Sequence, residues 1–385
     1  MIYLDNAATT WPKPETVYKA VNDCLQGVAG SPGRGSHGTA RAASYILYEA
    51  REELAELFNI ENPNNIAFTH NATDAINMAL TGFLKPGDKV VSTSMEHNAV
   101  ARTLRYLETK GVQLSIIACD SAGKLNLPAM EQALKEGART IAITHASNVT
   151  GTIMPLEEVG KLAAKYNAAV MVDAAQTAGV ERIDVKEMRI ALLAFSGHKG
   201  LLGPQGTGGV YIREDLTILP LRYGGTGSLS ESDMQPEFMP DRLESGTPNT
   251  PGIAGLTAGV RFIKKVGQGT IRKKEKQLAE QLLDGLQAIG GVKIYGPEDS
   301  EGRTAVLSFT INGQDSGAVA HRLDEKFGIA CRAGLHCAPW AHQTIGTLAT
   351  GTVRLSPGYF NTSDDISAAI QAVKLIADSY GEGGE

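Results

Sequence analysis

The strongest constraint on the fold is a repeated alternation of short apolar segments with longer stretches of helical periodicity, which begins near residue 66. Strand-sized apolar segments recur at residues 66–69, 89–93, 140–144 and 169–172. They contain little hydrophobic–polar alternation, which is typical of strands buried on both faces. A helical stretch at residues 73–84 separates the first two. This order predicts an α/β fold with a doubly wound, mostly parallel sheet that helices cover on both faces.

The alternation lapses in the second half of the chain. Residues 219–252 are rich in proline and glycine, which predicts a long loop. A charged helix is expected over residues 253–289, with a break near Gly267. Strands near 292–295 and 305–310, and helices near 318–327 and from residue 364, complete the pattern. We therefore predict a second, smaller α/β domain at the C-terminal end.

The composition narrows the class of function. The formal net charge is −6 and no basic cluster occurs, which argues against a nucleic-acid partner. No apolar stretch reaches the length of a membrane span, and the chain begins without the pattern of a secretory signal. The 4 cysteines are too few for a disulfide framework in a chain this long. We expect a cytoplasmic protein with reduced thiols and no membrane association.

Lys199 lies where an apolar segment gives way to serine, histidine and glycine residues, and Asp173 ends an earlier apolar segment. Open α/β sheets form their sites at such strand ends. A buried lysine can supply the neutral amine that forms a Schiff base, and an aspartate can face a protonated pyridine nitrogen. The two residues point to pyridoxal phosphate, although a surface lysine and a helix N-cap at Asp173 are the ordinary alternatives.

Four segments are specific when they are taken together: YLDNAAT at residues 3–9, THASNVTG at 144–151, VDAAQ at 172–176 and SGHK at 196–199. In this order, and over essentially the entire chain, they resemble the class V aminotransferase family and, within it, the cysteine desulfurases. The resemblance implies the fold type I of pyridoxal-phosphate enzymes. It implies a large cofactor-binding domain over residues 13–261 and a small domain formed by residues 1–12 and 262–385.

The resemblance also implies roles for single residues around the cofactor. Lys199 matches the Schiff-base lysine, Asp173 the partner of the pyridine nitrogen, and Gln176 the donor to the phenolic oxygen. His97 matches the imidazole that stacks on the cofactor ring and is a candidate proton shuttle. Without the family context, His97 is equally well explained as a histidine that packs near a strand end.

The phosphate of the cofactor is expected at a helix N-terminus, where free N–H groups favour an anion. The segment Asn71–Thr73 lies at a strand-to-helix turn, and Thr73 matches the family's phosphate ligand. The further residues that the resemblance assigns to cofactor binding are Ala72, Asn148, Ser196 and His198. Thr247 matches a loop that reaches the phosphate of the neighbouring subunit, which implies a homodimer with shared sites.

A second constellation, CRAGLHCAP, spans residues 331–339. It resembles the loop of the group II, or SufS-like, desulfurases in which a cysteine is the nucleophile. Cys337 is therefore the expected sulfur acceptor, and Arg332 and His336 could stabilise its thiolate. Group II sequences usually have a histidine where this chain has Leu335, which puts a proton-transfer role for that position in doubt.

Substrate contacts follow from the same resemblance. Arg354 matches the clamp for the substrate carboxylate, and a guanidinium suits this task because it forms two parallel hydrogen bonds. Arg332 and Asn148 are expected to assist, and Ala8 and His37 are expected to border the substrate.

Two other interpretations are weaker. Residues 33–38 match the G-x-G-x-x-G pattern of dinucleotide sites, but glycine and proline rather than a strand precede them, which disfavours a nicotinamide oxidoreductase. The two cysteines and two histidines between residues 331 and 342 fit no zinc spacing, so no metal is predicted. Burial as a small apolar residue is the favoured interpretation of Cys331.

The implied reaction removes sulfur from L-cysteine, releases L-alanine and leaves a persulfide on Cys337, which then passes to a thiol or a sulfur-carrier protein. A selenocysteine lyase acting on L-selenocysteine is the nearest alternative, because a selenolate leaves more readily and that reaction does not require Cys337. A class V aminotransferase is the third, and the Cys337 loop has no part in one. A non-catalytic scaffold would not require Lys199, Asp173 and Cys337 together.

Overall fold

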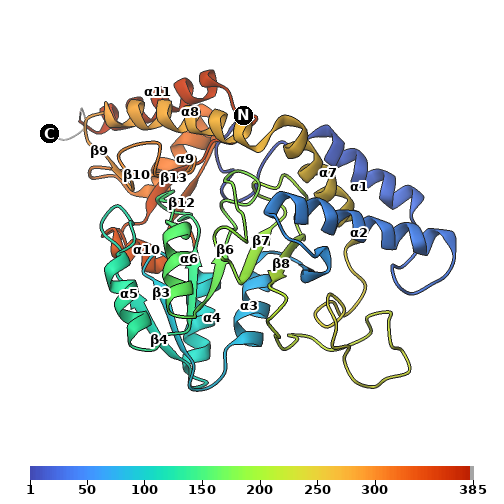
Figure 1. Cartoon of the computed structure of the whole chain (residues 1–385). Coiled ribbons are helices and arrows are strands. Elements are labelled where there is room, and N and C mark those ends of the chain that lie inside the picture. The colour runs from blue at the N-terminus through green and yellow to red at the C-terminus, as the bar shows by residue number, and fades with distance from the viewer. Residues whose placement is uncertain (382–385) are drawn as a thin grey trace.

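The computed structural model describes residues 1–381 and has an α/β architecture (Figure 1). Its larger part is built on a seven-stranded sheet with the order β2-β8-β7-β6-β5-β3-β4. The strands are Ile66–Thr69 (β2), Lys89–Thr93 (β3), Gln113–Ile117 (β4), Thr140–Thr144 (β5), Ala169–Asp173 (β6), Leu192–Ser196 (β7) and Gly208–Ile212 (β8). All neighbours are parallel except β8, which is antiparallel to both β2 and β7. The predicted doubly wound, mostly parallel sheet is confirmed.

Alternate residues of the sheet face two separate cores, because successive side chains of a strand point to opposite faces. Ile141 and Val172 pack on the face that is covered by α2, α5, α6 and α7, whereas Ala142 and Met171 pack on the face of α3 and α4. These helices are Gly38–Phe58 (α2), Ala72–Phe83 (α3), Asn98–Glu108 (α4), Leu127–Lys135 (α5), Leu156–Lys165 (α6) and Thr250–Val266 (α7). Helix α1, Glu15–Gly27, packs against α7 at the outer side of this part.

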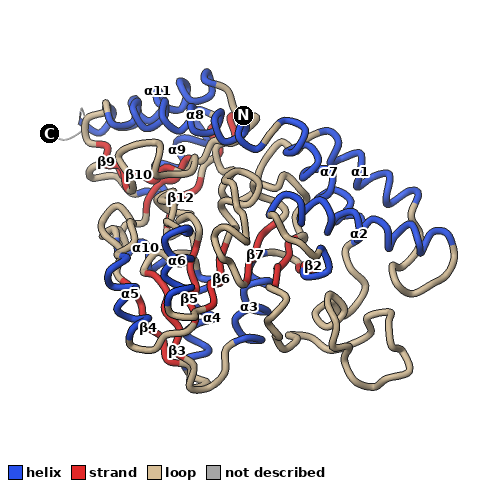
Figure 2. Tube along the Cα trace, viewed as in Figure 1, coloured by secondary structure: helices blue, strands red, loops and turns tan. Residues whose placement is uncertain are grey.

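The long loop and the broken helix that the sequence predicts are both present. Residues 213–249 form neither helix nor strand, and Figure 2 shows this segment extending from the body of the molecule. The charged helical stretch that follows consists of α7 and of α8, Gln268–Gln287. Gly267 separates the two helices with a φ of 90°, a left-handed conformation that favours glycine.

The second, smaller sheet is antiparallel and has the order β12-β13-β10-β9. Its strands are Val292–Tyr295 (β9), Leu307–Ile311 (β10), Arg332–Gly334 (β12) and Thr352–Leu355 (β13). Helices α8, Ser316–Phe327 (α9) and Ser363–Gly381 (α11) pack around it (Figure 1). The N-terminal strand Ile2–Tyr3 (β1) pairs in parallel with Ile329–Ala330 (β11), so the start of the chain joins this part. Residues 382–385 of the predicted small domain lie outside the described residues.

Two helices connect the two parts. Ile271 of α8 packs in the core of the large sheet, whereas Leu278 of the same helix packs in the core of the small sheet. Ala338, Ala341 and Ile345, in and beside α10 (Pro339–Thr344), also belong to the core of the large sheet. A segment that lies within the predicted small domain along the sequence is thus packed on the large one. The boundaries at residues 12/13 and 261/262 stay a prediction.

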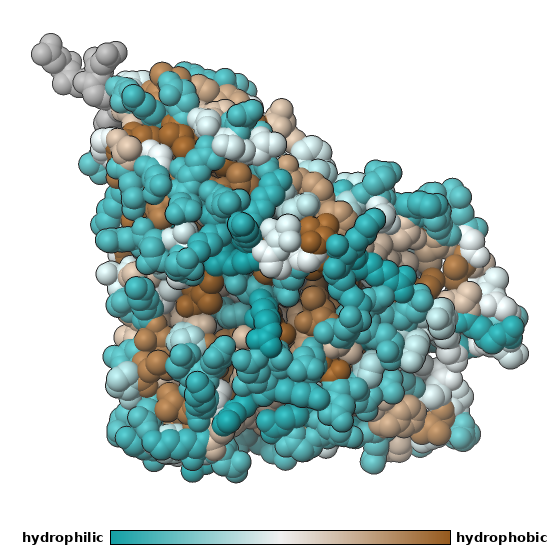
Figure 3. Space-filling view, turned by 45° about the horizontal axis from the view of Figure 1, so that its top comes forward, coloured by the Kyte–Doolittle hydropathy of each residue, from teal (hydrophilic) through white to brown (hydrophobic). Residues whose placement is uncertain are grey.

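The face drawn in Figure 3 is hydrophilic over most of its area, with separate hydrophobic patches between the polar side chains. Most of the strongly apolar side chains of the strands are buried in the three cores instead. Within residues 1–381, none of the helices has both the length and the apolar character that a membrane crossing requires.

Candidate active site

A cavity of about 280 Å³ lies at the carboxyl ends of β5, β6 and β7. Thr144, Asp173 and Ser196 are the last residues of these three strands. Because the strands are adjacent and parallel, their ends meet at one edge of the sheet, where open α/β sheets form sites. The other residues that line the cavity are Ala8, Asn71, Ala72, Thr73, His97, Ala99, Ala146, Asn148, Ala175, Gln176, His198 and Lys199.

Lys199 and Asp173 both face this cavity. Burial lowers the pKa of Lys199 to about 8, and the carboxylate of Asp173 works in the opposite direction. A lysine with this pKa is neutral in an appreciable fraction of molecules near neutral pH, as Schiff-base formation requires. Burial raises the pKa of Asp173, while the N–H of Ala175 (2.9 Å) and the charge of Lys199 lower it. A protonated pyridine nitrogen in the cavity would stabilise the carboxylate further.

His97 is the N-cap of α4, and its Nδ1 accepts a hydrogen bond from the N–H of Ala99 at 3.0 Å. Burial lowers the pKa of His97 to about 4, and the positive charges of Lys199 and Arg332 add to this effect. The imidazole is therefore neutral near pH 7. Since Nδ1 is the acceptor, the proton resides on Nε2.

The start of α3 forms a polar corner of the cavity. The Asn71 side chain caps the helix by accepting a hydrogen bond from the N–H of Asp74 at 2.9 Å, and the N–H of Ala72 donates to Ser196 Oγ at 2.9 Å. Thr73 and His198 lie beside them in the cavity wall. Within residues 1–381, the buried His198 Nδ1 has no hydrogen-bond partner. An unpaired nitrogen beside a helix N-terminus suits a phosphate group.

This combination fits pyridoxal phosphate. The cavity holds an amine with a lowered pKa, a buried carboxylate at its base and an anion-binding corner. Its volume is close to the lower end for small-molecule sites, roughly 300 Å³. The residues of this chain that the resemblance assigns to the ring and the phosphate of the cofactor therefore line one cavity.

Arg354 reaches the same region from β13 of the small sheet. Its side chain is 1% exposed, and its two terminal nitrogens donate to the carbonyl of Asn148 (3.0 Å) and to the carboxylate of Asp5 (2.7 Å). Its Nε is buried and has no partner within residues 1–381. Burial lowers the pKa of Arg354, although the adjacent Asp5 carboxylate favours the charged form. One edge of the guanidinium thus remains available for a further acceptor.

Cys337 is exposed and lies in the loop between β12 and α10. Arg332 donates a hydrogen bond to its Sγ at 3.4 Å. His336 does not serve this purpose, because its Nε2 lies 3.1 Å from the Thr352 hydroxyl in the interior. Burial lowers the pKa of His336 to about 2, so this ring carries no charge that could stabilise a thiolate.

The backbone of the Cys337 loop is attached to the walls of the cavity. The N–H of Asn98 donates to the carbonyl of Cys337 at 2.8 Å, and the side-chain amide of Asn148 donates to the carbonyl of His336 at 2.7 Å. His336 and Cys337 have φ values of 47° and 59°, a left-handed conformation that is uncommon for residues other than glycine. Two such residues in succession indicate a loop that its surroundings hold in one conformation.

The remaining predicted residues are distributed differently. Ala8 and Gln176 line the cavity, and the Gln176 amide donates to the carbonyl of Ala7 at 3.1 Å. His37 caps α2 on the surface, and Thr247 is exposed beside a separate small cavity. The resemblance assigns Thr247 to a neighbouring subunit, and its position outside this chain's own cavity is compatible with that role.

The sequence reasoning missed three polar residues of the site. Glu96 is fully buried, and its Oε1 accepts hydrogen bonds from the Thr93 hydroxyl and from the N–H of Thr144. Burial raises the pKa of Glu96 to about 8. Asp5 pairs with Arg354, and Lys13 contacts the carbonyl of His198. The only signal in the sequence was their position inside or beside the segments that resemble the family.

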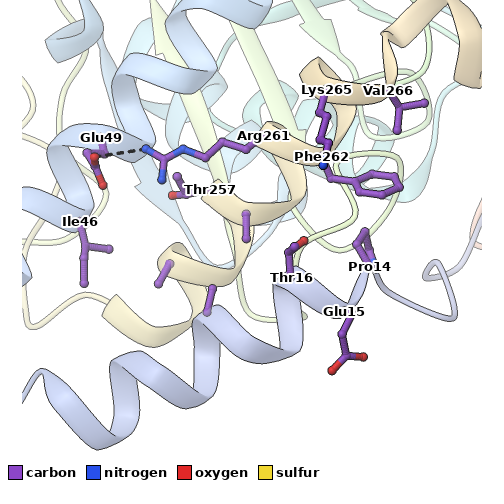
Figure 4. A pocket seen from close by; sticks show the side chains of 13 residues that line it. Pro14, Glu15, Thr16, Ile46, Glu49, Thr257, Arg261, Phe262, Lys265 and Val266 are labelled. Atoms are coloured by element: carbon purple, nitrogen blue, oxygen red, sulfur yellow. Dashed lines mark ion pairs between the residues drawn. The ribbon is translucent and has the colours of Figure 1, made fainter.

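A larger cavity of about 540 Å³ lies between α1, α2 and α7 (Figure 4). Its walls are mainly apolar, with Ile46, Phe262 and Val266 among them. Glu49 and Arg261 form an ion pair across it, so these charges compensate each other. The amine and the anion-binding corner that the chemistry requires are in the smaller cavity instead, and the Cys337 loop is hydrogen-bonded to its walls.

Comparisons with known proteins agree with this geometry. The chain matches the model of the family described as Aminotransferase class-V over residues 2–369. A "Probable cysteine desulfurase" of Methanothermobacter thermautotrophicus is 35% identical over 382 residues, which cover 98% of this chain and 94% of that protein. The solved cysteine desulfurase of Thermococcus onnurineus NA1 is 34% identical with a TM-score of 0.92, and the match covers 98% of this chain and 95% of that one. The solved cysteine desulfurase CsdA of Escherichia coli is 29% identical with a TM-score of 0.87 and the same coverage of both chains.

These matches span both sheets and confirm the predicted fold type I. They extend along nearly the whole length of the relatives as well as of this chain. The polar residues at the ends of β5, β6 and β7 lie within the matched range. The chain therefore belongs to the class V aminotransferase family.

Proposed function

We propose that this enzyme is a pyridoxal-phosphate-dependent cysteine desulfurase, which converts L-cysteine to L-alanine and keeps the sulfur as a persulfide on Cys337. The observation that carries the proposal is the attachment of the exposed Cys337 loop to the cavity that contains Lys199. Asn98, next to His97, donates to the Cys337 carbonyl, and Asn148 of the cavity wall donates to the His336 carbonyl. An aminotransferase has no use for a thiol held in this way.

Seven residues of the cavity would hold the cofactor. Asp173 would retain a proton at the pyridine nitrogen, Gln176 would donate to the phenolic oxygen, and the neutral His97 ring would stack on the pyridine ring. The phosphate would lie at the start of α3, with Ala72, Thr73, Ser196 and His198 around it. When bound, pyridoxal phosphate supplies an electron sink for the negative charge that develops on the substrate.

The substrate carboxylate would bind Arg354. Two of the three guanidinium nitrogens are occupied by Asn148 and Asp5, which fixes the orientation of the group. The unpaired Nε is the edge that remains for the carboxylate. Arg332 and Asn148 would assist, and Ala8 would border the substrate.

Protons and sulfur would then be transferred by residues of this chain. Lys199, with its pKa of about 8, can take the Cα proton of the substrate as a neutral amine. The Cys337 sulfur attacks the substrate sulfur, so a sulfur–sulfur bond forms as the Cβ–S bond breaks. The electron pair of the broken bond remains on the substrate, whose Cβ takes up a proton. One cysteine and one enzyme thiol thus give one alanine and one enzyme persulfide.

A homodimer is part of the proposal. Thr247 is exposed and does not line this chain's own candidate cavity, so a role at a phosphate points to a neighbouring subunit. Clustered exposed apolar side chains are typical of interaction surfaces. The loop before Thr247 exposes six large apolar side chains by 42% to 75%: Leu219, Leu221, Tyr223, Leu229, Met234 and Phe238. Sedimentation equilibrium should give twice the chain mass of 40.7 kDa.

The persulfide would pass from Cys337 to a small thiol or to a sulfur-acceptor protein, since the cysteine is exposed. We also propose a cytoplasmic location, where thiols remain reduced. Both statements extend the proposed reaction and can be tested apart from it.

The decisive experiment measures alanine, sulfide and selenide from L-cysteine and from L-selenocysteine, in the parent protein and in Cys337→Ser. We expect C337S to lose cysteine turnover, whereas a selenocysteine lyase would retain turnover of selenocysteine. Unchanged cysteine turnover in C337S contradicts the persulfide mechanism. Lys199→Ala should abolish turnover of both substrates, and residual activity in K199A would contradict the entire scheme.

A further inference from the structure

The segment from Asp5 to Lys13, here called the N-terminal strap, contacts three separate parts of the candidate site. We propose that this strap positions Lys199 and that Lys13 is the positioning residue that fixes the His198–Lys199 peptide. The inference deepens the proposed function, on which it rests for the role of Lys199. Its central residue, Lys13, received no role in the sequence analysis.

The strap converges on the carbonyl of His198, the residue immediately before Lys199. Four donors lie within hydrogen-bonding distance of this oxygen: Lys13 Nζ at 2.7 Å, the Thr10 N–H at 3.1 Å, Thr9 Oγ1 at 3.1 Å and Thr10 Oγ1 at 3.2 Å. The Thr10 hydroxyl is also 3.1 Å from the carbonyl of Lys199. A carbonyl oxygen has two lone pairs, so four donors are more than the His198 oxygen can accept hydrogen bonds from at the same time. Its position is therefore strongly determined by the strap.

Lys13 is an unusual residue for a purely structural contact. Its ammonium group is partly buried, and within residues 1–381 it forms no ion pair with a carboxylate. Burial lowers the pKa of Lys13 to about 8. A buried cation without a counterion costs free energy, and a neutral donor could bind a carbonyl without that cost. The Lys13 charge is instead directed at the peptide that carries the Schiff-base lysine.

The other end of the strap holds the substrate-binding side of the site. The Asp5 carboxylate accepts a hydrogen bond from Arg354 at 2.7 Å, and the Ala7 carbonyl accepts one from Gln176 at 3.1 Å. Between these contacts, the N–H of Ala7 donates to Ser356 Oγ at 3.0 Å. The strap thus links β13 of the small sheet to the end of β7 in the large sheet. It fixes the distance between the amine and the carboxylate clamp.

The test replaces Lys13 by methionine, which retains the apolar stem and removes the charge. The first readout is the rate at which the cofactor-free protein attaches pyridoxal phosphate covalently to Lys199, followed by visible absorbance. We expect K13M to slow this attachment at least about 10-fold, because small displacements of reacting groups have effects of this size. The second readout is cysteine turnover, where kcat should fall at least about 10-fold while KM changes by less than about 2-fold. K13R, which restores a cation, should recover most of both rates.

Lys19→Met is the matched control, since Lys19 lies nearby on α1 with a side chain that is 72% exposed and pairs with Asp23. K19M should leave both rates unchanged. The inference is overturned if K13M attaches the cofactor and turns over cysteine at rates within about 2-fold of the parent, or if K13R is as slow as K13M. If K13M does not fold, Thr9→Val removes another donor to the same carbonyl and should slow attachment measurably, whereas an unchanged rate overturns the inference.

The two proposals fail separately. Cofactor attachment does not depend on which substrate the enzyme uses. A slow attachment in K13M with no cysteine turnover in the parent would support the strap and contradict the desulfurase. Normal cofactor attachment in K13M, together with Cys337-dependent cysteine turnover in the parent, would support the desulfurase and contradict the role of the strap.

Discussion

Arg332 donates a hydrogen bond to the Sγ of Cys337 across 3.4 Å, from the first residue of β12 to the loop that follows this strand. Arg332 is the cation that bonds the thiol directly, and the neighbouring His336 is neutral and turned inward. A guanidinium retains its charge at all physiological pH values. The Cys337 sulfur therefore has a permanent cationic hydrogen-bond partner.

Replacing Arg332 by methionine should reduce the reactivity of Cys337. The variant removes the charged donor that lies 3.4 Å from the Cys337 Sγ, and a positive charge beside the sulfur stabilises the transition state in which a cysteine acts as a nucleophile. We expect R332M to slow alkylation of Cys337 by iodoacetamide about 10-fold at pH 7. Alkylation can be followed by mass spectrometry. Arg213→Met, which breaks an exposed pair with Asp215, is the control and should leave the rate unchanged; an equal rate in R332M would contradict the role of Arg332.

Arg354→Met should weaken substrate binding more than it affects any later step. The variant loses the positive charge and the hydrogen bond that Nε would donate to the carboxylate, so KM for L-cysteine should rise about 100-fold. Removing a buried partner of Asp5 should also lower the free energy of unfolding by about 3 kcal/mol. Arg303→Met offers a control, since Arg303 is a fully buried arginine outside the cavity lining. Arg303→Met should lower the free energy of unfolding but leave KM unchanged. If both variants have a similar KM for L-cysteine, Arg354 does not bind the substrate carboxylate.

The pH dependence of cofactor attachment should report the pKa of Lys199. Only the neutral amine reacts, so in the cofactor-free protein the rate should rise with pH and reach half of its plateau at about pH 8. The Asp173 carboxylate stabilises the Lys199 ammonium and raises the pKa. Asp173→Asn should therefore move the midpoint to lower pH. A midpoint near the ordinary lysine value of 10.5 would show that Lys199 is not desolvated.

Glu96 should behave as a neutral hydrogen-bonding group near pH 7. Burial raises its pKa from 4.5 to about 8, so the folded state binds more protons than the unfolded state between these values. Stability that depends on Glu96 should thus be present below pH 4.5 and be lost as the pH rises through about 8. Glu96→Gln, which is neutral and of the same shape, should remove this pH dependence. The free energy of unfolding can be measured with urea at several pH values. If it depends on pH in E96Q as it does in the parent, the raised pKa of Glu96 is contradicted.

Glu96→Ala tests the hydrogen bonds rather than the charge. The variant leaves the Thr93 hydroxyl and the N–H of Thr144 without their buried acceptor. A cost of about 2 kcal/mol is expected for groups unpaired in this way. Denaturant unfolding should therefore show E96A to be clearly less stable than E96Q at pH 7.

Local patterns in the sequence were sufficient for the main elements. The apolar runs at residues 140–144 and 169–172 correspond to β5 and to β6. The break in the charged helix occurs at Gly267, where the left-handed backbone conformation requires a residue without a side chain. The pairing of β1 with β11 was not predictable, because two-residue strands carry no periodic signal.

The cavity was predictable only in part, for a physical reason. Asp173 and Ser196 end the neighbouring parallel strands β6 and β7, and Lys199 follows in the turn after β7, so strand order alone brings them together. The contact between Asp5 and Arg354 joins residues 349 positions apart, and no local pattern encodes such a distance. Glu96 and Lys13 owe their unusual pKa values to burial, which becomes visible only when the tertiary packing is known.

The attachment of α10 to the core of the large sheet has a consequence for how the reacting groups are placed. Cys337 lies just before α10, where Ala338 and Ala341 are buried with the large sheet, and the Cys337 carbonyl is bonded to Asn98 of α4. Arg354, in contrast, belongs to β13 of the small sheet, and the N-terminal strap sets its distance from Lys199. The thiol and the carboxylate clamp are thus held relative to the amine by two different attachments. A mutation can therefore change one of these two distances without changing the other.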